Sequence, residues 1–187
     1  MINKKNKMNE LKTKLSLKVK IPSRAIPAPS SPASRHLNEC THITDNIYIS
    51  GYKTSIDYSF LKSNNFTHII NCAGGSQTFN PIYFEDFSYL TLELRDDCTS
   101  DIEKVVEEFL TFMKENSSNS QNKILIHCSE GISRAPALLC SYLMWKKRLC
   151  FNEALQMIKE KRSCVEINLS FMFQLENLTP KLIEVIA

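Results

Sequence analysis

The stretch Lys123-Ile-Leu-Ile-His-Cys-Ser-Glu-Gly-Ile-Ser-Arg-Ala-Pro136 sets the organisation of this chain. Its apolar start, Ile124–Ile126, predicts a short buried strand that ends at His127 and Cys128. A loop with one glycine follows, and an apolar helical pattern begins just after Arg134. The sequence therefore predicts a strand, a tight loop and a helix in direct succession, with a cysteine at the C-terminal end of the strand.

The predicted position of Cys128 favours a thiolate. Backbone N–H groups converge at such a turn, and the N-terminus of the following helix carries a partial positive charge. Both features stabilise an anion, and therefore the thiolate form of a cysteine. Arg134, six residues later, can fold back over the loop and present its planar guanidinium to a phosphate. We infer a nucleophilic thiolate in a loop shaped for a phosphate group.

Composition indicates one folded domain and a tail. The 187 residues are 43% apolar and 23% charged, which is ordinary for a globular protein. No apolar run approaches the roughly 20 residues of a membrane-spanning helix, and no signal peptide opens the sequence. Seven cysteines without a CxxC pair, and four scattered histidines, argue against a disulfide framework and a structural zinc site. We expect a cytoplasmic location, where thiols stay reduced, with the nucleus as a second option.

The net charge of +3 is unevenly distributed along the chain. Residues 1–40 hold nine Lys or Arg and two Glu, a balance of +7. Residues 41–187 hold the remaining 14 basic and 18 acidic residues, a balance of −4. Because residues 1–40 also carry four of the seven prolines and no core pattern, they predict a basic, Pro/Ser-rich disordered arm. A mildly acidic domain over 41–187 follows.

One segment of the arm, Lys12–Leu17, has three interpretations. Its basic and aliphatic residues alternate, which suits an extended segment with one apolar and one basic face. The first interpretation is a solvated arm. The second is a docking peptide, because Lys12 and Lys14 before Leu15 and Leu17 resemble the motif that binds acidic grooves on mitogen-activated kinases. The third is adsorption to an anionic membrane surface.

Strands and helices alternate within the predicted domain. Apolar runs bounded by turn residues predict strands over residues 41–44, 47–50, 68–72, 89–94 and 124–126. Apolar residues at helical spacing predict helices over residues 55–64, 102–113, 137–145, 152–161 and 168–178. We expect Ser100 and Glu103 to form a capping box, Asn168 to cap the last helix, and Thr179-Pro180 to end it. This order predicts an α/β fold with a central, mainly parallel sheet flanked by helices, and ligands beyond the C-terminal ends of the strands.

The pattern His127-Cys128-x-x-Gly131-x-x-Arg134, placed between a strand and a helix, resembles the catalytic loop of the cysteine-dependent dual-specificity protein phosphatases. The resemblance covers roughly residues 41–178 and implies a protein tyrosine phosphatase-like fold. It also includes Ile47-Tyr-Ile-Ser-Gly51, His68-Ile-Ile-Asn71, Tyr142-Leu-Met144 and Asn168-x-Ser-Phe171.

The resemblance implies phosphoryl transfer in two steps. Cys128 would attack phosphorus and form a phosphocysteine, while the loop N–H groups and Arg134 hold the phosphate oxygens. Asp96, 32 residues before Cys128, would protonate the leaving Ser, Thr or Tyr oxygen and then activate water. Asp97 is the competing candidate for this acid. The phosphate-binding residues implied are Ser129, Glu130, Gly131, Ile132, Ser133 and Arg134.

Two further residues are interpreted as supporting this loop. His127 would orient it and tune the thiolate, and Asn168 would be a helix cap first and a brace for the loop second. The resemblance implies neither a metal nor an organic cofactor.

Two positions depart from the family pattern. Ala135 stands where the family usually has Ser or Thr, whose hydroxyl can hydrogen-bond the thiolate as the phosphocysteine breaks down. Its absence predicts a slow enzyme that accumulates the intermediate. Ile167 precedes Asn168 where proline is common, which affects local rigidity more than chemistry.

The loop composition narrows the substrate class. Glu130 and the lack of a lysine in the loop disfavour phosphoinositides, for which relatives use basic loops. We therefore expect phosphoprotein substrates, and a shallow site that admits phospho-Ser and phospho-Thr as well as phospho-Tyr.

Cys72 closes a predicted strand at a place where some relatives carry a second cysteine that forms a reversible disulfide with the nucleophile. Such a partner for Cys128 would prevent irreversible oxidation. The alternative interpretation is a buried cysteine at the end of a strand.

Three functions are compatible with these features. An active dual-specificity protein phosphatase leads, because Cys128, Arg134 and Asp96 are all present. The alternative is a low-activity scaffold that binds phosphoproteins or kinases, which Ala135 favours. An RNA 5′-phosphatase finds support in the basic arm, but the acidic domain and Glu130 disfavour it, so no nucleic acid partner is expected.

Overall fold

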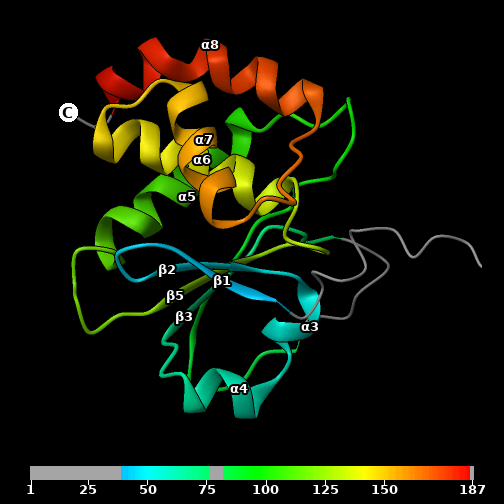
Figure 1. The fold of residues 1–187 in the computed structure, drawn as a ribbon, viewed down its shortest axis with the longest axis vertical. Coiled ribbons are helices and arrows are strands. Elements are labelled where there is room, and N and C mark those ends of the chain that lie inside the picture. Colours follow the sequence, from blue (N-terminus) through cyan, green and yellow to red (C-terminus); the bar gives the residue numbers. More distant parts are fainter. Residues whose placement is uncertain (1–38, 76–81, 186–187) are drawn as a thin grey trace, which may run out of the picture. The chain divides into compact units, whose positions relative to one another are not determined.

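The computed structural model describes residues 39–75 and 82–185 (Figure 1). Except for its last two residues, the predicted arm lies outside the described residues, and so does the Lys12–Leu17 segment.

A five-stranded mixed sheet forms the centre of the domain. Its order is β1-β2-β5-β3-β4; β1 runs antiparallel to β2, and all other neighbours are parallel. This arrangement confirms the predicted α/β fold with a mainly parallel sheet. The strands are β1 (Cys40–Thr44), β2 (Ile47–Ser50), β3 (His68–Asn71), β4 (Ser88–Thr91) and β5 (Ile124–His127).

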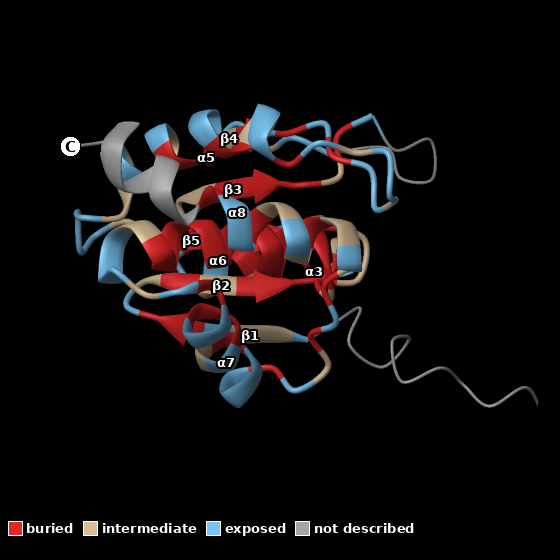
Figure 2. Ribbon diagram, turned by 90° about the horizontal axis from the view of Figure 1, so that it is seen from above, coloured by how far each residue is buried: buried red, intermediate tan, exposed pale blue. Residues whose placement is uncertain are grey.

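Strand β5 occupies the middle of the sheet, and all four of its residues are buried (Figure 2). Ile126 is in register with Ile49 on β2 and with Ile70 on β3. Branched side chains on neighbouring strands pack well against each other on a pleated surface, which explains why so short an apolar run forms a central strand. The C-terminal end of β5, which leads into Cys128, therefore lies between the ends of β2 and β3.

Helices cover both faces of the sheet (Figure 1). Ile70 and Ile126 pack into the larger core beneath α5–α8, whereas the alternate residues Ile69 and Leu125 pack into a smaller core with Leu61 of α4. The helices are α3 (Tyr52–Ser55), α4 (Tyr58–Ser63), α5 (Glu103–Asn116), α6 (Arg134–Lys147), α7 (Phe151–Lys161) and α8 (Leu169–Val185).

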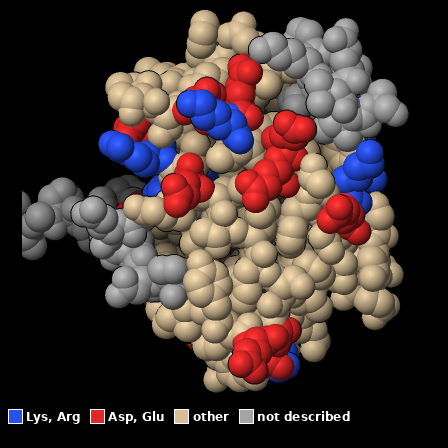
Figure 3. Space-filling model, turned by 180° about the vertical axis from the view of Figure 1, so that it is seen from behind, with Lys and Arg blue, Asp and Glu red and all other residues tan. Residues whose placement is uncertain are grey.

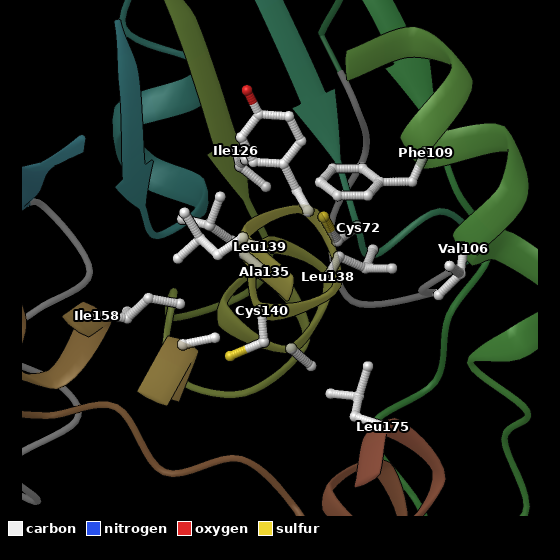
Figure 4. Close-up of a cluster of buried hydrophobic side chains, with 14 of the residues drawn as sticks. Cys72, Val106, Phe109, Ile126, Ala135, Leu138, Leu139, Cys140, Ile158 and Leu175 are labelled. Atoms are coloured by element: carbon white, nitrogen blue, oxygen red, sulfur yellow. The ribbon is translucent and has the colours of Figure 1, made fainter. Parts of the chain in front are cut away.

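Helix α6 runs through the larger core and fixes the loop that precedes it. Every residue from Arg134 to Met144 is buried. Figure 4 shows Ala135, Leu138 and Leu139 of this helix among side chains from the sheet and from α5 and α8. A helix that is apolar all round belongs in the interior, so its N-terminus, where the loop ends, is held rigidly.

The start of α5 differs from the prediction. The capping box of Ser100 and Glu103 is absent, because the helix begins at Glu103 with Ile102 as its N-cap residue. Asp101 instead accepts the Glu103 N–H at 3.1 Å, and Gln174 of α8 accepts the Ile102 N–H at 2.8 Å. A partner remote in sequence has therefore replaced the local cap.

Helix α8 also departs from the prediction. Asn168 caps it as expected, accepting the Phe171 N–H at 2.9 Å. The helix does not end at Thr179-Pro180 but continues to Val185. A proline removes a single N–H donor, and the buried Phe171 and Leu175 already hold the helix on the core. Phe173, between these two residues, points outward and is 69% exposed.

The described part of the chain presents a mixed surface. Acidic and basic side chains are interspersed on the face shown in Figure 3. No helix within residues 39–75 and 82–185 is long and apolar enough to cross a membrane. Among the same residues no cluster of His, Cys, Asp or Glu is arranged to hold a metal ion.

Candidate active site

The loop from His127 to Arg134 forms a cradle around the Cys128 sulfur. Cys128 is 2% exposed and accepts a hydrogen bond from the Gly131 N–H, with Sγ and N 3.3 Å apart. Gly131 adopts φ +70°, and a Cβ at this position would lie 2.5 Å from the Ser50 carbonyl oxygen. Only glycine fits this turn without strain, and the turn aims a backbone N–H at the thiol.

Arg134 lies in the first turn of α6, with its side chain directed back over the loop. One terminal guanidinium nitrogen donates to Ser129 Oγ at 2.6 Å, and the other lies 3.5 Å from the Leu94 carbonyl oxygen. Its Nε is buried and makes no hydrogen bond to the described residues. A phosphate oxygen bound in the loop could accept the hydrogen bond that this buried donor lacks.

Asp96 reaches the same loop from the segment after β4. The predicted strand over 89–94 is shorter than expected, ending at Thr91, but Leu92 and Leu94 are buried and fix the chain that leads to Asp96. Asp96 Oδ1 accepts hydrogen bonds from Ser133 Oγ at 2.7 Å and from the Asn168 side chain at 2.6 Å. Its Oδ2 lies 3.5 Å from Arg134 Nε.

The competing carboxylate, Asp97, is held outside this site. It pairs with Arg95 at 3.0 Å and accepts hydrogen bonds from the hydroxyl and N–H of Thr99. These Thr99 hydrogen bonds lower the pKa of Asp97. Because these contacts hold Asp97 away from the cleft that Asp96, Cys128 and Arg134 line together, the geometry favours Asp96.

His127 is buried beneath the loop. Its Nδ1 lies 3.4 Å from the Cys128 carbonyl oxygen. Burial lowers the pKa of His127 from 6.5 to about 4, and the nearby Arg134 charge adds to this effect. The imidazole is therefore neutral at physiological pH and supports the loop without adding positive charge.

Cys72 follows β3 and is fully buried in the larger core, in the same cluster as Phe109 and Ala135 (Figure 4). Its N–H donates to the His127 carbonyl oxygen at 2.8 Å, which ties the end of β3 to the end of β5. Burial raises the pKa of Cys72 well above 9.0, and the charge of Cys128 adds to the rise. Cys72 is thus a protonated thiol in electrostatic contact with the nucleophile candidate, and both cysteines are free.

A cleft of about 770 Å³ opens above the cradle. Lys159 of α7 lies in its wall, so a lysine, which the loop itself lacks, is present in the cleft. No aromatic side chain is among the described residues that line it. The lining residues are Asp96, Cys128, Ser129, Glu130, Ile132, Ser133, Arg134, Leu155, Lys159, Glu166, Ile167, Asn168, Leu169 and Met172.

Most of the site residues named from sequence lie at this cleft. Cys128, Arg134, Asp96, Asn168 and most loop residues line it, and Gly131 forms the turn. His127 and Cys72 do not line it; both are buried, and the Cys72 N–H donates to the His127 carbonyl oxygen.

Two contacts were not foreseen from the sequence. The Ser133 hydroxyl links the loop to Asp96, and the buried Arg162 side chain donates to the loop backbone. The position of Arg162, directly after a helical pattern and shortly before Asn168, was the one available signal for it.

Comparison with known proteins agrees with this geometry. Residues 47–180 match the family model for the dual specificity phosphatase catalytic domain. The protein-tyrosine-phosphatase MKP1 of Arabidopsis thaliana is 36% identical over 138 residues, which cover 73% of this chain and 17% of that protein. Dual specificity protein phosphatase 1B, also of Arabidopsis thaliana, is 28% identical over 138 residues, which cover 74% of this chain and 80% of that protein. The chain spans 17%, 15% and 18% of the length of the first three curated relatives.

Solved structures match the same region. The crystal structure of DUSP15 superposes with a TM-score of 0.68 at 25% identity, covering 80% of this chain and 98% of the other. The Yvh1 phosphatase domain from Chaetomium thermophilum gives a TM-score of 0.69 at 20% identity, covering 80% of this chain and 100% of the other, and so indicates a shared fold.

Proposed function

The chain belongs to the dual specificity phosphatase catalytic-domain family, whose members are protein phosphatases, and we propose that it hydrolyses phospho-Tyr, phospho-Ser and phospho-Thr on proteins. The observation that carries this proposal is the meeting of Cys128, Arg134 and Asp96 in one cleft. Each comes from a different element, and together they supply a nucleophile, an anion clamp and an acid.

The first step forms a phosphocysteine. The Cys128 thiolate attacks phosphorus, an S–P bond forms, and the P–O bond to the substrate side chain breaks. The Asp96 carboxyl group gives its proton to the departing oxygen. Arg134 Nε and the inward N–H groups of the loop bind the phosphoryl oxygens, and their fixed positions stabilise the charge in the transition state.

The second step releases phosphate. The Asp96 carboxylate takes a proton from a water molecule that attacks phosphorus, and the S–P bond breaks to regenerate the thiolate. Ala135 places no hydroxyl beside the sulfur at this stage, so the second step is slow and the phosphocysteine accumulates.

The lining of the cleft supports a dual specificity. None of its described residues is an aromatic side chain that would clamp a phosphotyrosine ring. Tyr52, Tyr83 and Tyr89 line a separate, smaller pocket that also reaches Cys128, so the open cleft is the part of the site that we propose admits short phosphorylated side chains as well as phosphotyrosine.

Hydrolysis of an aryl phosphate and of matched phospho-Tyr, phospho-Thr and phospho-Ser peptides tests the proposal. The wild type is expected to release phosphate from all four substrates, and Cys128→Ser from none. Background rates for both proteins would contradict phosphatase activity and favour the phosphoprotein-binding scaffold.

Mitogen-activated kinases are the proposed partners. The docking segment is Lys12–Leu17, which lies outside the described residues. Support comes from a relative named MAP kinase phosphatase with leucine-rich repeats protein 1 of Dictyostelium discoideum, 32% identical over 134 residues. Replacing Lys12 and Lys14 by Ala should abolish binding of the full chain to such a kinase, whereas the control Lys4→Ala with Lys5→Ala should not. Equal binding by all three proteins would refute this docking site.

We further propose a cytoplasmic location, which imaging of the tagged full chain tests.

Reversible oxidation is proposed for the Cys72–Cys128 pair. After mild peroxide treatment, mass spectrometry should find a crosslink between these two cysteines in the wild type. Absence of the crosslink, with sulfinic acid at Cys128 instead, would contradict it.

A further inference from the structure

Four successive carbonyl groups of the catalytic loop accept hydrogen bonds from outside the loop. The Ser129 carbonyl accepts from the Tyr52 N–H at 3.0 Å, and the Ile132 carbonyl accepts from the Glu166 N–H at 3.0 Å. The two carbonyls between them are held by one side chain. Arg162 donates from a terminal guanidinium nitrogen to Glu130 O at 3.1 Å and from Nε to Gly131 O at 2.9 Å.

This arrangement fixes the direction of the loop N–H groups. In a planar trans peptide the C=O and the N–H point in opposite directions. Holding the Glu130 carbonyl on Arg162 therefore turns the Gly131 N–H the other way, and that N–H is the one that lies 3.3 Å from Cys128 Sγ. In the same way, holding the Gly131 carbonyl turns the Ile132 N–H toward the inner side of the loop.

Arg162 is itself rigidly held. It is 2% exposed and follows the last residue of α7, where its own N–H donates to the Ile158 carbonyl oxygen at 2.9 Å. Its remaining guanidinium nitrogen donates to Thr41 Oγ1 of β1 at 2.8 Å and to the Glu39 carbonyl oxygen at 3.4 Å. A buried guanidinium is tolerated when its N–H groups are satisfied, and here backbone carbonyls of the loop satisfy them. Charge-assisted hydrogen bonds of this kind also polarise the peptide groups that accept them.

We propose that Arg162 is a positioning residue of the anion site. It aligns and polarises two successive peptide groups so that their N–H ends stabilise the Cys128 thiolate and bind a tetrahedral oxyanion. Of the four outside donors, the other two are backbone N–H groups, so Arg162 is the member of this set that a substitution can remove. The inference rests on the site of the proposed function, but it does not require turnover.

Alkylation of Cys128 by iodoacetamide, followed by mass spectrometry of the full chain over a range of pH, reports the thiolate. Protection by tungstate in the same assay reports oxyanion binding. In Arg162→Met the alkylation midpoint should move to higher pH, and tungstate should bind roughly 10-fold more weakly or worse. Arg162→Lys should be affected in the same direction, because one ammonium cannot span both carbonyls and Thr41.

Thr41→Val is the matched control. It removes the Thr41 hydroxyl that accepts from Arg162 but leaves the hydrogen bonds to the Glu39, Glu130 and Gly131 carbonyl oxygens, so its alkylation curve and tungstate affinity should equal those of the wild type. The other charged or titratable groups near Cys128 are unchanged in all variants; they are Arg134, Asp96, Glu130, Lys159 and Glu166 at the cleft, together with the buried His127 and Cys72.

A folded Arg162→Met protein with wild-type values in both readouts would overturn the proposal. If Arg162→Met fails to fold, Arg162→Lys serves as the test variant, because it keeps the buried positive charge. Wild-type tungstate affinity in Arg162→Lys would then overturn the proposal. A wild type that binds tungstate but hydrolyses no phosphate ester would refute the proposed function and leave this inference intact.

Discussion

Ala135 stands where the family resemblance leads us to expect Ser or Thr. It is fully buried in the first turn of α6, directly after Arg134, and carries no hydroxyl to stabilise the departing thiolate. Cys128, Arg134 and Asp96 lie together in the cleft, so the deficit that we propose concerns the second step and not the first.

Ala135→Ser should therefore raise steady-state turnover of an aryl phosphate and reduce the fraction of enzyme found as phosphocysteine. A hydroxyl that hydrogen-bonds the leaving thiolate stabilises it by about 1.5–3 kcal/mol, which is roughly a 10-fold or greater effect on the second step. Stopped-flow kinetics measure both quantities. Ala137→Ser, an equally buried alanine of the same helix, is the control for the change of size and should show no gain. Unchanged turnover in Ala135→Ser would show that the missing hydroxyl does not limit the rate.

Asp96 and Asp97 are adjacent in sequence but have opposite surroundings. Asp96→Asn should lower kcat for a phosphopeptide by roughly 10²–10⁴-fold, because the amide cannot donate an acidic proton to the leaving oxygen. Asp97→Asn should stay near the wild-type rate, since Asp97 pairs with Arg95 outside the cleft. Measuring kcat for both variants separates the two assignments, and a larger loss in Asp97→Asn would reverse them.

His127 gives the fold a dependence on pH. Burial lowers the pKa of this side chain from 6.5 to about 4, so between these values the unfolded chain binds a proton that the folded chain excludes. Stability should therefore fall as the pH decreases from 6.5 toward 4, by about 3 kcal/mol at most, and level off below. Urea unfolding at pH 7.5 and pH 5 measures the effect. His127→Gln should lose less stability between these pH values than the wild type. The control His42→Gln replaces an exposed histidine of β1 and should lose as much stability as the wild type. Equal losses in all three proteins would mean that His127 does not carry the dependence.

At the scale of elements, the α7–α8 segment supports the catalytic loop along its length. The Arg162 side chain, the Glu166 N–H and the Asn168 N–H contact successive loop residues, and Asn168 also binds Asp96 and caps α8. Because the first turn of α8 is fixed to the general-acid candidate, the next exposed residues of that helix lie beside the cleft.

Leu169 and Phe173 are exposed by 81% and 69%, and one helical turn separates them on α8. Leu169 lines the cleft, so an apolar residue beside the phosphorylated side chain of a substrate would contact it. Leu169→Ser should lower kcat/KM roughly 5- to 10-fold for a phosphopeptide with a flanking leucine, by loss of about 1 kcal/mol of apolar contact.

The same variant should hydrolyse a small aryl phosphate at the wild-type rate. Tyr58→Ser changes an exposed aromatic residue remote from the cleft and should alter neither substrate. An equal loss on peptide and aryl phosphate in Leu169→Ser would place the defect in the catalytic loop instead.

At the scale of the whole molecule, the sequence predicts those elements whose structure is determined by contacts between residues close together in the chain. The β5–loop–α6 unit was predictable because its strand, glycine turn and buried helix follow each other directly. The parallel sheet followed from the alternation of strands and helices. The sequence also indicated Asp96, although Asp97 could be set aside only when its contacts with Arg95 and Thr99 were visible.

Contacts between residues distant in sequence were not predictable, because they depend on how the elements pack and not on local sequence. The cap of α5 depends on Gln174, 72 residues from Ile102, and the support of Gly131 depends on Arg162, 31 residues away. The exposed position of Phe173 depends on how α8 packs. None of these pairings leaves a periodic or spaced pattern in the sequence.

The central claim is that Cys128 carries the phosphoryl group between the two steps. Rapid acid quench of the full chain with a phosphopeptide, followed by mass spectrometry, tests it most directly. We predict that the peptide containing Cys128 gains the mass of one phosphoryl group. With an aryl phosphate as substrate, the wild type and Asp96→Asn should both show this adduct. Cys128→Ser should show none. Phosphate release by the wild type without any adduct at Cys128, or at an equal rate in Cys128→Ser, would contradict the account.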